Sequence, residues 1–291
     1  MTDPILKCAK GHGVAINLAA WEGKAGPILC IHGITANCRC WDVLAHSLSP
    51  AYRILAMDLR GRGRSEKPAT GYSLKYHVQD IRCVLDDLRI DRAVIMGHSL
   101  GAFIGLAFAA EHPERVEKLI LVDGGGDLSK EQMDKVFAGI KPSLDRLGQV
   151  YPDAEAYLSK MRMAPFIQPW SPAIENYYRY EIEETDDGVR TNITPAHIAE
   201  EADNIRKVKC AEYYARVRCN VLILRATDGL LSDDDLLLPG DVVDRMLREI
   251  PKPRWVNVPG ANHYGILFQP HPARDQAIRE FLRETGSVTA L

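Results

Sequence analysis

Ser99 lies in the segment of the chain whose residue types and spacing are most typical of a reaction centre. It is the middle residue of Gly97-His98-Ser99-Leu100-Gly101, which follows the apolar run Ala93–Met96 and precedes a run of small and apolar residues. This order predicts a strand, a sharp turn and a helix, and a serine on such a turn projects its hydroxyl as a nucleophile. Glycine is needed on both sides because a Cβ there would clash with neighbouring backbone. The segment therefore predicts covalent catalysis by Ser99.

Two backbone N–H groups are expected to bind the negative charge that such a nucleophile creates on a carbonyl oxygen. One belongs to Leu100, at the N-terminus of the predicted helix, where the helix dipole is positive. The other belongs to Ile34, in the loop that follows the apolar run Pro27–Ile31, where Gly33 allows the turn. The adjacent His32 is expected to pack within this loop rather than to act on a substrate.

The chain has nine histidines among which to seek a general base. The base must face Ser99 from a loop that leaves the carboxyl end of a strand. His263 meets this requirement, because a short loop joins it to the predicted strand Arg254–Val258. His98 adjoins the nucleophile in sequence but is expected to point away from it, and His271 lies between two prolines at the start of a predicted helix.

Together these segments resemble the α/β-hydrolase superfamily, in a branch with a cap inserted into the catalytic domain. Two further segments carry the resemblance, Asp58-Leu-Arg-Gly61-Arg-Gly63-Arg-Ser65 and Leu119-Ile-Leu-Val-Asp123, and all occur in the superfamily's order over nearly the whole chain. The resemblance implies a Ser–His–acid triad and acyl transfer through a covalent intermediate. A serine nucleophile excludes the branches that use aspartate, the haloalkane dehalogenases and the epoxide hydrolases.

The acid of the implied triad has three candidate positions. Most superfamily members carry it after the next-to-last strand, here Val221–Arg225, but Asp228 lies one residue earlier than that pattern requires. Some members carry it after the strand that follows the nucleophile helix, where this chain has Asp123 followed by glycines. Asp123 is preferred, because the carboxyl end of a strand beside the nucleophile permits contact with the loop of His263. Asp228 stays the alternative, the run Asp233–Asp235 is the third, and a structural carboxylate is the other interpretation of Asp123.

Short apolar runs alternate with helical patterns through most of the chain, which predicts an α/β fold. The predicted strands are Ile5–Lys10, Val14–Ala20, Ile28–Ile31, Arg53–Met57, Ala93–Met96, Lys118–Val122, Val221–Leu224 and Arg254–Val258. Ile5–Lys10 is an eighth candidate added to the other seven. The first pair of those seven, Val14–Ala20 and Ile28–Ile31, has no helix between its strands and is expected to form a hairpin. The others are expected to form a mostly parallel, twisted sheet of about eight strands flanked by helices.

The alternation is interrupted between residues 128 and 216, which are rich in aromatic residues and prolines. We expect a helical cap there, inserted into a hydrolase core made of residues 1–127 and 217–291. Phe166, Trp170 and Tyr178 are the candidates to line a substrate pocket under this cap. Arg162 and Arg179 are candidates for binding a substrate carboxylate, but a solvated surface is the preferred interpretation of both.

Composition excludes several classes of protein. Lys and Arg total 36 against 39 Asp and Glu, for a net charge of −3, so the basic excess of a nucleic-acid-binding protein is missing. No apolar run approaches the ~18 residues of a membrane span. The seven cysteines and the absence of a signal-peptide pattern favour reduced thiols and a cytoplasmic location. Cys38 and Cys40 are too close together for a zinc site, and neither a metal nor a cofactor is expected.

The leading functional hypothesis is a carboxylic ester hydrolase that acts on a small to medium, partly apolar ester or lactone. Its partner would be a small-molecule substrate. An amide or carbon–carbon bond hydrolase of a catabolic pathway is the alternative within the same mechanism. A ligand receptor with slow turnover on the same fold is the alternative from another class.

Overall fold

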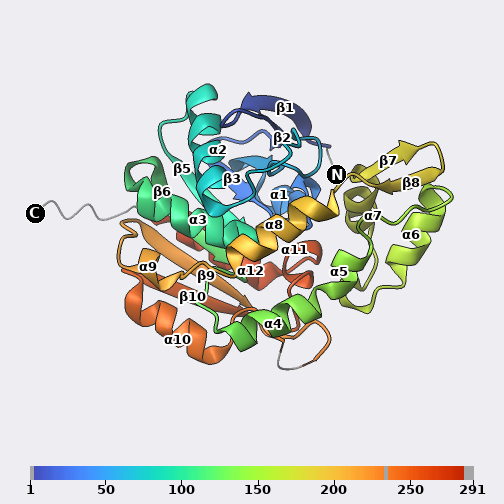
Figure 1. Ribbon diagram of the computed structural model, residues 1–291. Helices are drawn as coiled ribbons and strands as arrows, with labels where there is room; N and C mark the ends of the chain where they lie inside the picture. Colours follow the sequence, from blue (N-terminus) through green and yellow to red (C-terminus); the bar gives the residue numbers. More distant parts are fainter. Residues whose placement is uncertain (1–2, 233–234, 285–291) are drawn as a thin grey trace, which may run out of the picture.

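The computed structural model describes residues 3–232 and 235–284, and an eight-stranded sheet forms its centre (Figure 1). The strand order across the sheet is β1-β2-β4-β3-β5-β6-β9-β10. The strands are β1 (Ile5–Lys10), β2 (Ala15–Trp21), β3 (Ala25–Ile31), β4 (Tyr52–Met57), β5 (Ala93–His98), β6 (Val116–Val122), β9 (Asn220–Ala226) and β10 (Pro253–Val258). This architecture confirms the predicted α/β class and the predicted size of the sheet.

The sheet is antiparallel at one edge and parallel elsewhere. β1 pairs with β2 and β2 with β4 in antiparallel fashion, whereas every other neighbouring pair is parallel. The hairpin expected between Val14–Ala20 and Ile28–Ile31 is wrong, because β4 lies between β2 and β3. β2 instead forms a hairpin with β1 at the start of the chain. The parallel strands β3, β5, β6 and β9 are largely continuous Ile, Leu and Val runs because helices cover both of their faces.

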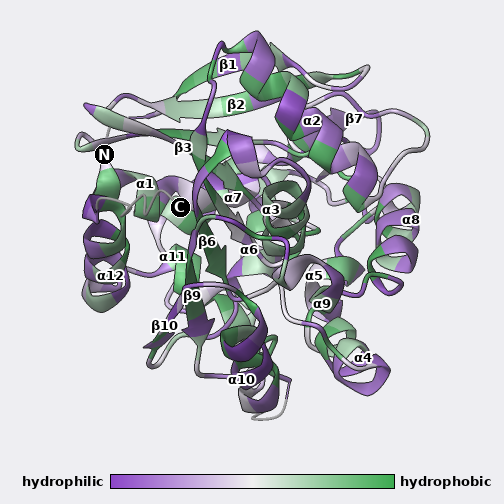
Figure 2. Ribbon diagram, turned by 90° about the vertical axis from the view of Figure 1, so that its left-hand side faces the viewer, coloured by the Kyte–Doolittle hydropathy of each residue, from purple (hydrophilic) through white to green (hydrophobic). Residues whose placement is uncertain are grey.

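Helices of the core cover the two faces of the sheet. α1 (Asp42–Leu48) and α12 (Pro272–Arg283) lie on one side, and α2 (Leu74–Asp87) and α3 (Leu100–Glu111) on the other (Figure 2). α2 is amphipathic and buries Val78, Ile81 and Val84 along one stripe. α3 is apolar on every side and is buried from Leu100 to Ala110. A helix buried all round is held rigidly, which suits the helix that follows the predicted nucleophile, Ser99. The remaining core elements are η1 (Cys38–Trp41), η2 (Pro113–Arg115), α10 (Gly240–Glu249) and α11 (Gly265–Phe268).

The segment between β6 and β9 is mainly helical. Its elements are α4 (Lys130–Gly139), α5 (Lys141–Asp145), α6 (Ala154–Arg162), η3 (Pro165–Ile167), α7 (Pro172–Tyr180), β7 (Ile182–Thr185), β8 (Gly188–Thr191), α8 (Pro195–Ile205) and α9 (Ala211–Tyr214). Figure 1 shows α6, α7, β7 and β8 gathered at one end of the molecule. The hairpin β7–β8 has no counterpart in the sequence prediction, because its strands are short and largely polar. No helix in the described ranges is long and apolar enough to cross a membrane.

Candidate active site

Ser99 occupies a strained turn between β5 and α3. Its φ of 55° and ψ of −122° lie in a region that non-glycine residues rarely adopt. The neighbouring glycines make the turn possible: a Cβ on Gly97 would lie 2.0 Å from the Gly101 carbonyl oxygen, and a Cβ on Gly101 would lie 2.0 Å from that of Ile31. Across the turn, a Cβ on Gly124 would lie 2.7 Å from the Ser99 carbonyl oxygen. Close backbone packing at these three glycines therefore fixes the turn that carries Ser99.

His263 and Asp123 are hydrogen-bonded to each other beside Ser99. The His263 Nδ1–H donates to Asp123 Oδ2 at 2.7 Å, and both side chains are buried. The other carboxylate oxygen of Asp123 accepts the Ala226 N–H at 3.1 Å. Asp123 follows β6 with a φ of 44°, a left-handed conformation that aspartate tolerates better than most residues. Because Nδ1 is occupied by Asp123, Nε2 is the nitrogen of His263 that remains for a reaction at Ser99.

The two other acid candidates have different surroundings. Asp228 is exposed, and its carboxylate accepts the hydroxyl of Thr227 at 2.8 Å. Asp235 is buried, and its carboxylate accepts the backbone N–H groups of Leu230 and Leu231 at 2.6 and 2.7 Å. Residues 233 and 234 lie outside the described residues. Of the described candidates, the structure brings Asp123 alone into contact with His263.

His98 contacts His263 through both its ring and a hydrogen bond. Sequence reasoning expected His98 to point away from the reaction centre, but its ring stacks on the His263 ring with 4.4 Å between centroids. Its Nε2–H donates to the His263 carbonyl oxygen at 2.9 Å. Burial, reinforced by the neighbouring His263, lowers the pKa of His98 well below its ordinary value, so the ring stays neutral. A neutral donor in this place orients the His263 loop without adding a charge beside the His263 ring.

The peptide between Gly33 and Ile34 is held in one orientation. Its carbonyl oxygen accepts the His32 Nδ1–H at 2.7 Å and the Ala36 N–H at 3.2 Å. The other ring nitrogen of His32 accepts the Leu59 N–H at 3.0 Å, and burial lowers the pKa of His32 to about 4. In a trans peptide the N–H and C=O point in opposite directions. Fixing the Gly33 carbonyl therefore aims the Ile34 N–H away from His32, and His32 packs in the loop as the sequence predicted.

Two buried arginines hold the next two carbonyls of the same loop. Arg62 Nε donates to the Ile34 carbonyl oxygen at 3.1 Å, and its Nη2 pairs with Glu201 at 3.0 Å. Arg146 Nη2 donates to the Thr35 carbonyl oxygen at 2.8 Å, and its guanidinium forms a bidentate pair with Glu181 at 2.8 and 2.9 Å. We call these contacts the Arg62–Glu201 clamp and the Arg146–Glu181 clamp.

The clamps connect the loop of Ile34, the predicted oxyanion loop, to the segment between β6 and β9. Glu201 lies on α8 and Glu181 follows α7, so both counter-ions come from residues 128–216. Sequence reasoning missed both arginines. Arg62 lies inside a motif that supported the family resemblance, but nothing in the local sequence of Arg146 indicates a partner so far along the chain.

Glu201 is ionised in its buried position. Its Oε2 also accepts the Nε2–H of His77 at 2.8 Å. Burial alone would raise the pKa of Glu201, but the neighbouring His77 and Arg62 outweigh this effect by charge and hydrogen bonding and lower the pKa to about 2. The Arg62–Glu201 clamp is therefore a charged, fully desolvated contact.

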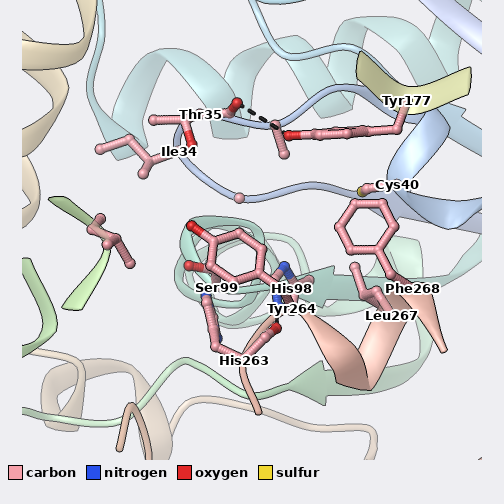
Figure 3. A pocket seen from close by; sticks show the side chains of 13 residues that line it. Ile34, Thr35, Cys40, His98, Ser99, Tyr177, His263, Tyr264, Leu267 and Phe268 are labelled. Atoms are coloured by element: carbon pink, nitrogen blue, oxygen red, sulfur yellow. Dashed lines mark hydrogen bonds between the residues drawn. The ribbon is translucent and has the colours of Figure 1, made fainter. Parts of the chain in front are cut away.

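Ser99 lines two cavities, and Figure 3 shows the first of them. The first, which we call the His263 cavity, encloses about 390 Å³, part of it open to solvent, and is lined by Gly33, Ile34, Thr35, Ala36, Cys40, His98, Ser99, Ile140, Tyr177, His263, Tyr264, Leu267 and Phe268. The second, which we call the α4 cavity, encloses about 440 Å³, again partly open, and is lined by Ile34, Ser99, Leu100, Phe103, Leu128, Met133, Val136, Phe137, Ile140, Ile205 and Leu237. Neither lining includes a lysine or an arginine among the residues that the structure describes.

The three aromatic residues predicted to line the pocket do not line either of these cavities. Phe166 is buried against Tyr264 at 4.8 Å between ring centroids. Trp170 and Tyr178 stack on each other at 5.6 Å between ring centroids. The aromatic side chains of the His263 cavity are instead Tyr177, Tyr264 and Phe268, as Figure 3 shows. The sequence alone does not show which aromatic residues line the cavity and which pack elsewhere, because both groups come from aromatic segments that pack together.

Other predicted ligand groups take structural roles. Arg162 and Arg179 lie on the surface and pair with Glu155 and Glu175. Cys38 and Cys40 are buried free thiols, and burial raises their pKa well above the ordinary value. Within residues 3–232 and 235–284, no three His, Cys, Asp or Glu side chains gather as a metal site.

Comparisons with known proteins agree with this architecture. A family model for the alpha/beta hydrolase fold matches residues 26–270. The 2-(acetamidomethylene)succinate hydrolase of Mesorhizobium japonicum is 31% identical over 260 residues, which cover 86% of either chain. The crystal structure of E-2-(acetamidomethylene)succinate hydrolase matches with a TM-score of 0.85 at 26% identity, over 97% of this chain and 100% of that one. Serine hydrolase-like protein 2 of Homo sapiens is 27% identical over 93% of this chain and 91% of its own length.

Proposed function

The chain belongs to the α/β-hydrolase family, and from this premise we propose that it is a serine hydrolase that cleaves an uncharged carboxylic ester or lactone through an acyl-enzyme on Ser99. The observation that carries the proposal is the hydrogen bond of 2.7 Å between His263 and Asp123, with Ser99 and His263 lining one cavity. In this mechanism Ser99 is the nucleophile, His263 the general base and Asp123 the acid that orients it.

The first half of the reaction forms the acyl-enzyme. His263 Nε2 takes the proton of the Ser99 hydroxyl as the oxygen attacks the substrate carbonyl. Asp123 holds the ring in the tautomer with Nδ1–H and stabilises the imidazolium that forms. The carbonyl oxygen becomes an oxyanion and accepts the N–H groups of Ile34 and Leu100, the second of which is at the positive end of the α3 dipole. The imidazolium then gives its proton to the leaving alcohol.

The second half releases the acid. Water takes the place of the alcohol, His263 removes a proton from it, and the hydroxide attacks the acyl carbonyl. The same two N–H groups stabilise the second oxyanion. His263 finally returns the proton to Ser99 Oγ, so that enzyme and base are restored and the products are a carboxylic acid and an alcohol.

The cavities favour an uncharged substrate. A buried carboxylate needs a cationic or strongly donating partner, because desolvation of an unpaired charge is costly. The linings of both cavities, as far as the structure describes them, lack lysine and arginine. The relative from Mesorhizobium japonicum is named for a succinate, which carries carboxylates. We therefore propose that this chain does not act on an acidic substrate of the kind in that relative's name.

We also propose that residues 128–216 act as the cap over the site. Ile140, Tyr177 and Ile205 from this segment line the two cavities. The Arg62–Glu201 and Arg146–Glu181 clamps join it to the loop of Ile34. Both observations support a cap that shapes the pocket and steadies the catalytic loop.

The test is hydrolysis of a series of p-nitrophenyl esters by the wild type and by Ser99→Ala. We expect rapid turnover by the wild type and a loss of about 10³-fold or more in kcat for the variant. An inert wild type, or one that stops after a single acylation, would reject the ester proposal.

Amide hydrolysis is the second candidate. It is favoured by the 31% identity to a hydrolase whose name contains an acetamido group. A matched pair of substrates, the ester and the anilide of one uncharged acid, discriminates the two. A kcat/KM for the anilide that equals or exceeds that for the ester would favour amide hydrolysis.

A further inference from the structure

The two cavities at Ser99 differ in their relation to the general base. His263 lines the His263 cavity and is missing from the lining of the α4 cavity. In the proposed reaction the imidazolium must reach the oxygen of the leaving group to protonate it. A leaving group in the α4 cavity would be on the wrong side of Ser99 for this transfer. The leaving group and the attacking water must therefore use the His263 cavity.

The reacting carbonyl must then lie where the two cavities join. Ile34, Ser99 and Ile140 line both cavities. The two proposed oxyanion donors are the N–H groups of Ile34 and Leu100, and Leu100 lines the α4 cavity alone. A carbonyl bound at this junction directs one substituent toward His263 and the other into the α4 cavity.

The α4 cavity suits a hydrocarbon chain. Apart from Ser99, the residues that the structure describes in its lining are aliphatic, aromatic or methionine. They come from α3, α4, α8 and the loops near Ile34, Leu128 and Leu237. The cavity is partly open to solvent, so a chain can enter it from outside. A polar or charged acyl group would lose its hydration there without gaining a hydrogen bond.

We propose that the α4 cavity is the acyl subsite and that it selects substrates with an uncharged, aliphatic acyl chain, while the His263 cavity receives the leaving group. This assignment rests on the proposed function of Ser99 as an acylated nucleophile. It places acyl specificity on α4, through Met133, Val136 and Phe137, rather than on the aromatic cluster around Trp170. The class of substrate is thus an ester of a fatty acid of short to medium length.

The experiment compares two matched enlargements, Val136→Phe in the α4 cavity and Leu267→Phe in the His263 cavity. Each is assayed on p-nitrophenyl esters from acetate to octanoate and on hexanoate esters of methanol, butanol and hexanol. For the wild type we expect kcat/KM to rise about fourfold for each methylene that enters the α4 cavity, then to level off. Val136→Phe should lower the ratio of hexanoate to acetate activity by about tenfold or more, and Leu267→Phe should leave that ratio within twofold and alter the dependence on the alcohol.

The opposite pattern would overturn the assignment. If Leu267→Phe changes the acyl ratio and Val136→Phe changes the alcohol dependence, the roles of the two cavities are reversed. If neither variant changes either ratio, the α4 cavity does not hold the acyl chain. A fluorophosphonate probe followed by mass spectrometry separates this failure from failure of the proposed function. Labelling of Ser99 in each folded variant keeps the nucleophile assignment, whereas an unlabelled wild-type Ser99 rejects the proposed function itself.

Discussion

Replacement of Glu201 by glutamine tests the coupling between the inserted segment and the oxyanion loop. The substitution keeps the shape of the side chain and removes the charge that Arg62 and His77 face. The pKa of Glu201 is about 2 in the folded protein against an ordinary 4.5. At 1.36 kcal/mol per pKa unit, this difference corresponds to about 3 kcal/mol of stability carried by the ionised form. This value agrees with the cost of breaking a buried ion pair by removing one partner, which is about 3–5 kcal/mol of stability.

The expected result is a clear loss of stability at neutral pH. For a chain of 291 residues, whose unfolding entropy is about 0.6 kcal/mol/K, a loss of about 3 kcal/mol corresponds to a fall in Tm of roughly 5 °C. The exposed Glu184 of β7 provides the matched control, since Glu184→Gln removes the same charge from the same segment without touching a buried cation. Thermal unfolding followed by circular dichroism measures both variants against the wild type at pH 7.

The pH dependence supplies a second, independent readout. A carboxyl group with a lowered folded pKa contributes stability that is complete above its unfolded pKa of about 4.5 and is lost as the pH falls toward 2. The difference between wild type and Glu201→Gln should therefore shrink between pH 5 and pH 3. Urea unfolding at pH 5 and at pH 3 measures this difference in stability.

The Arg62–Glu201 clamp also predicts a change in kcat. Because Arg62 holds the Ile34 carbonyl, a loosened arginine should lower kcat for ester hydrolysis by about tenfold, less than the complete loss of an oxyanion donor. A variant with unchanged Tm, or with a stability loss that is the same at pH 3 as at pH 7, would refute the reasoning from the buried charge.

Three further predictions concern the groups around His263. Asp123→Asn should lower kcat by about 10⁴-fold while the fold is kept, and Asp228→Asn should retain the wild-type kcat. Equal losses of kcat in the two variants would mean that the triad acid is misassigned. His98→Phe keeps the ring contact and removes the N–H that donates to the His263 carbonyl, so kcat should fall about tenfold at unchanged KM. Rescue of kcat by His98→Asn would separate a positioning role of His98 from a packing role. His32 has a pKa of about 4 in the folded protein against an ordinary 6.5, so the unfolded chain binds a proton first and stability falls as the pH drops from 6.5 to 4. His32→Asn should flatten this part of the plot of urea midpoint against pH. An unchanged slope would contradict the prediction.

Sequence alone determined the parts of this protein that depend on short-range sterics and periodicity. The strands of the sheet were predictable because parallel strands covered on both faces need continuous apolar runs. The turn at Ser99 was predictable because a Cβ on Gly97 or Gly101 would lie only 2.0 Å from a backbone oxygen, so both positions accept glycine alone. The β7–β8 hairpin escaped prediction because its short strands have no apolar alternation to reveal them.

Tertiary structure decided everything that depends on which distant residues meet. Asp123 and Asp228 both follow strands of the sheet, and the local sequence does not say which carboxylate turns toward His263; the positive φ of Asp123 and the placement of β6 do. The linings of the cavities and the two arginine clamps are likewise contacts between segments far apart in the chain. Such contacts depend on how the inserted helices pack on the core, because packing selects the side chains that face Ser99 from many that share the same local pattern.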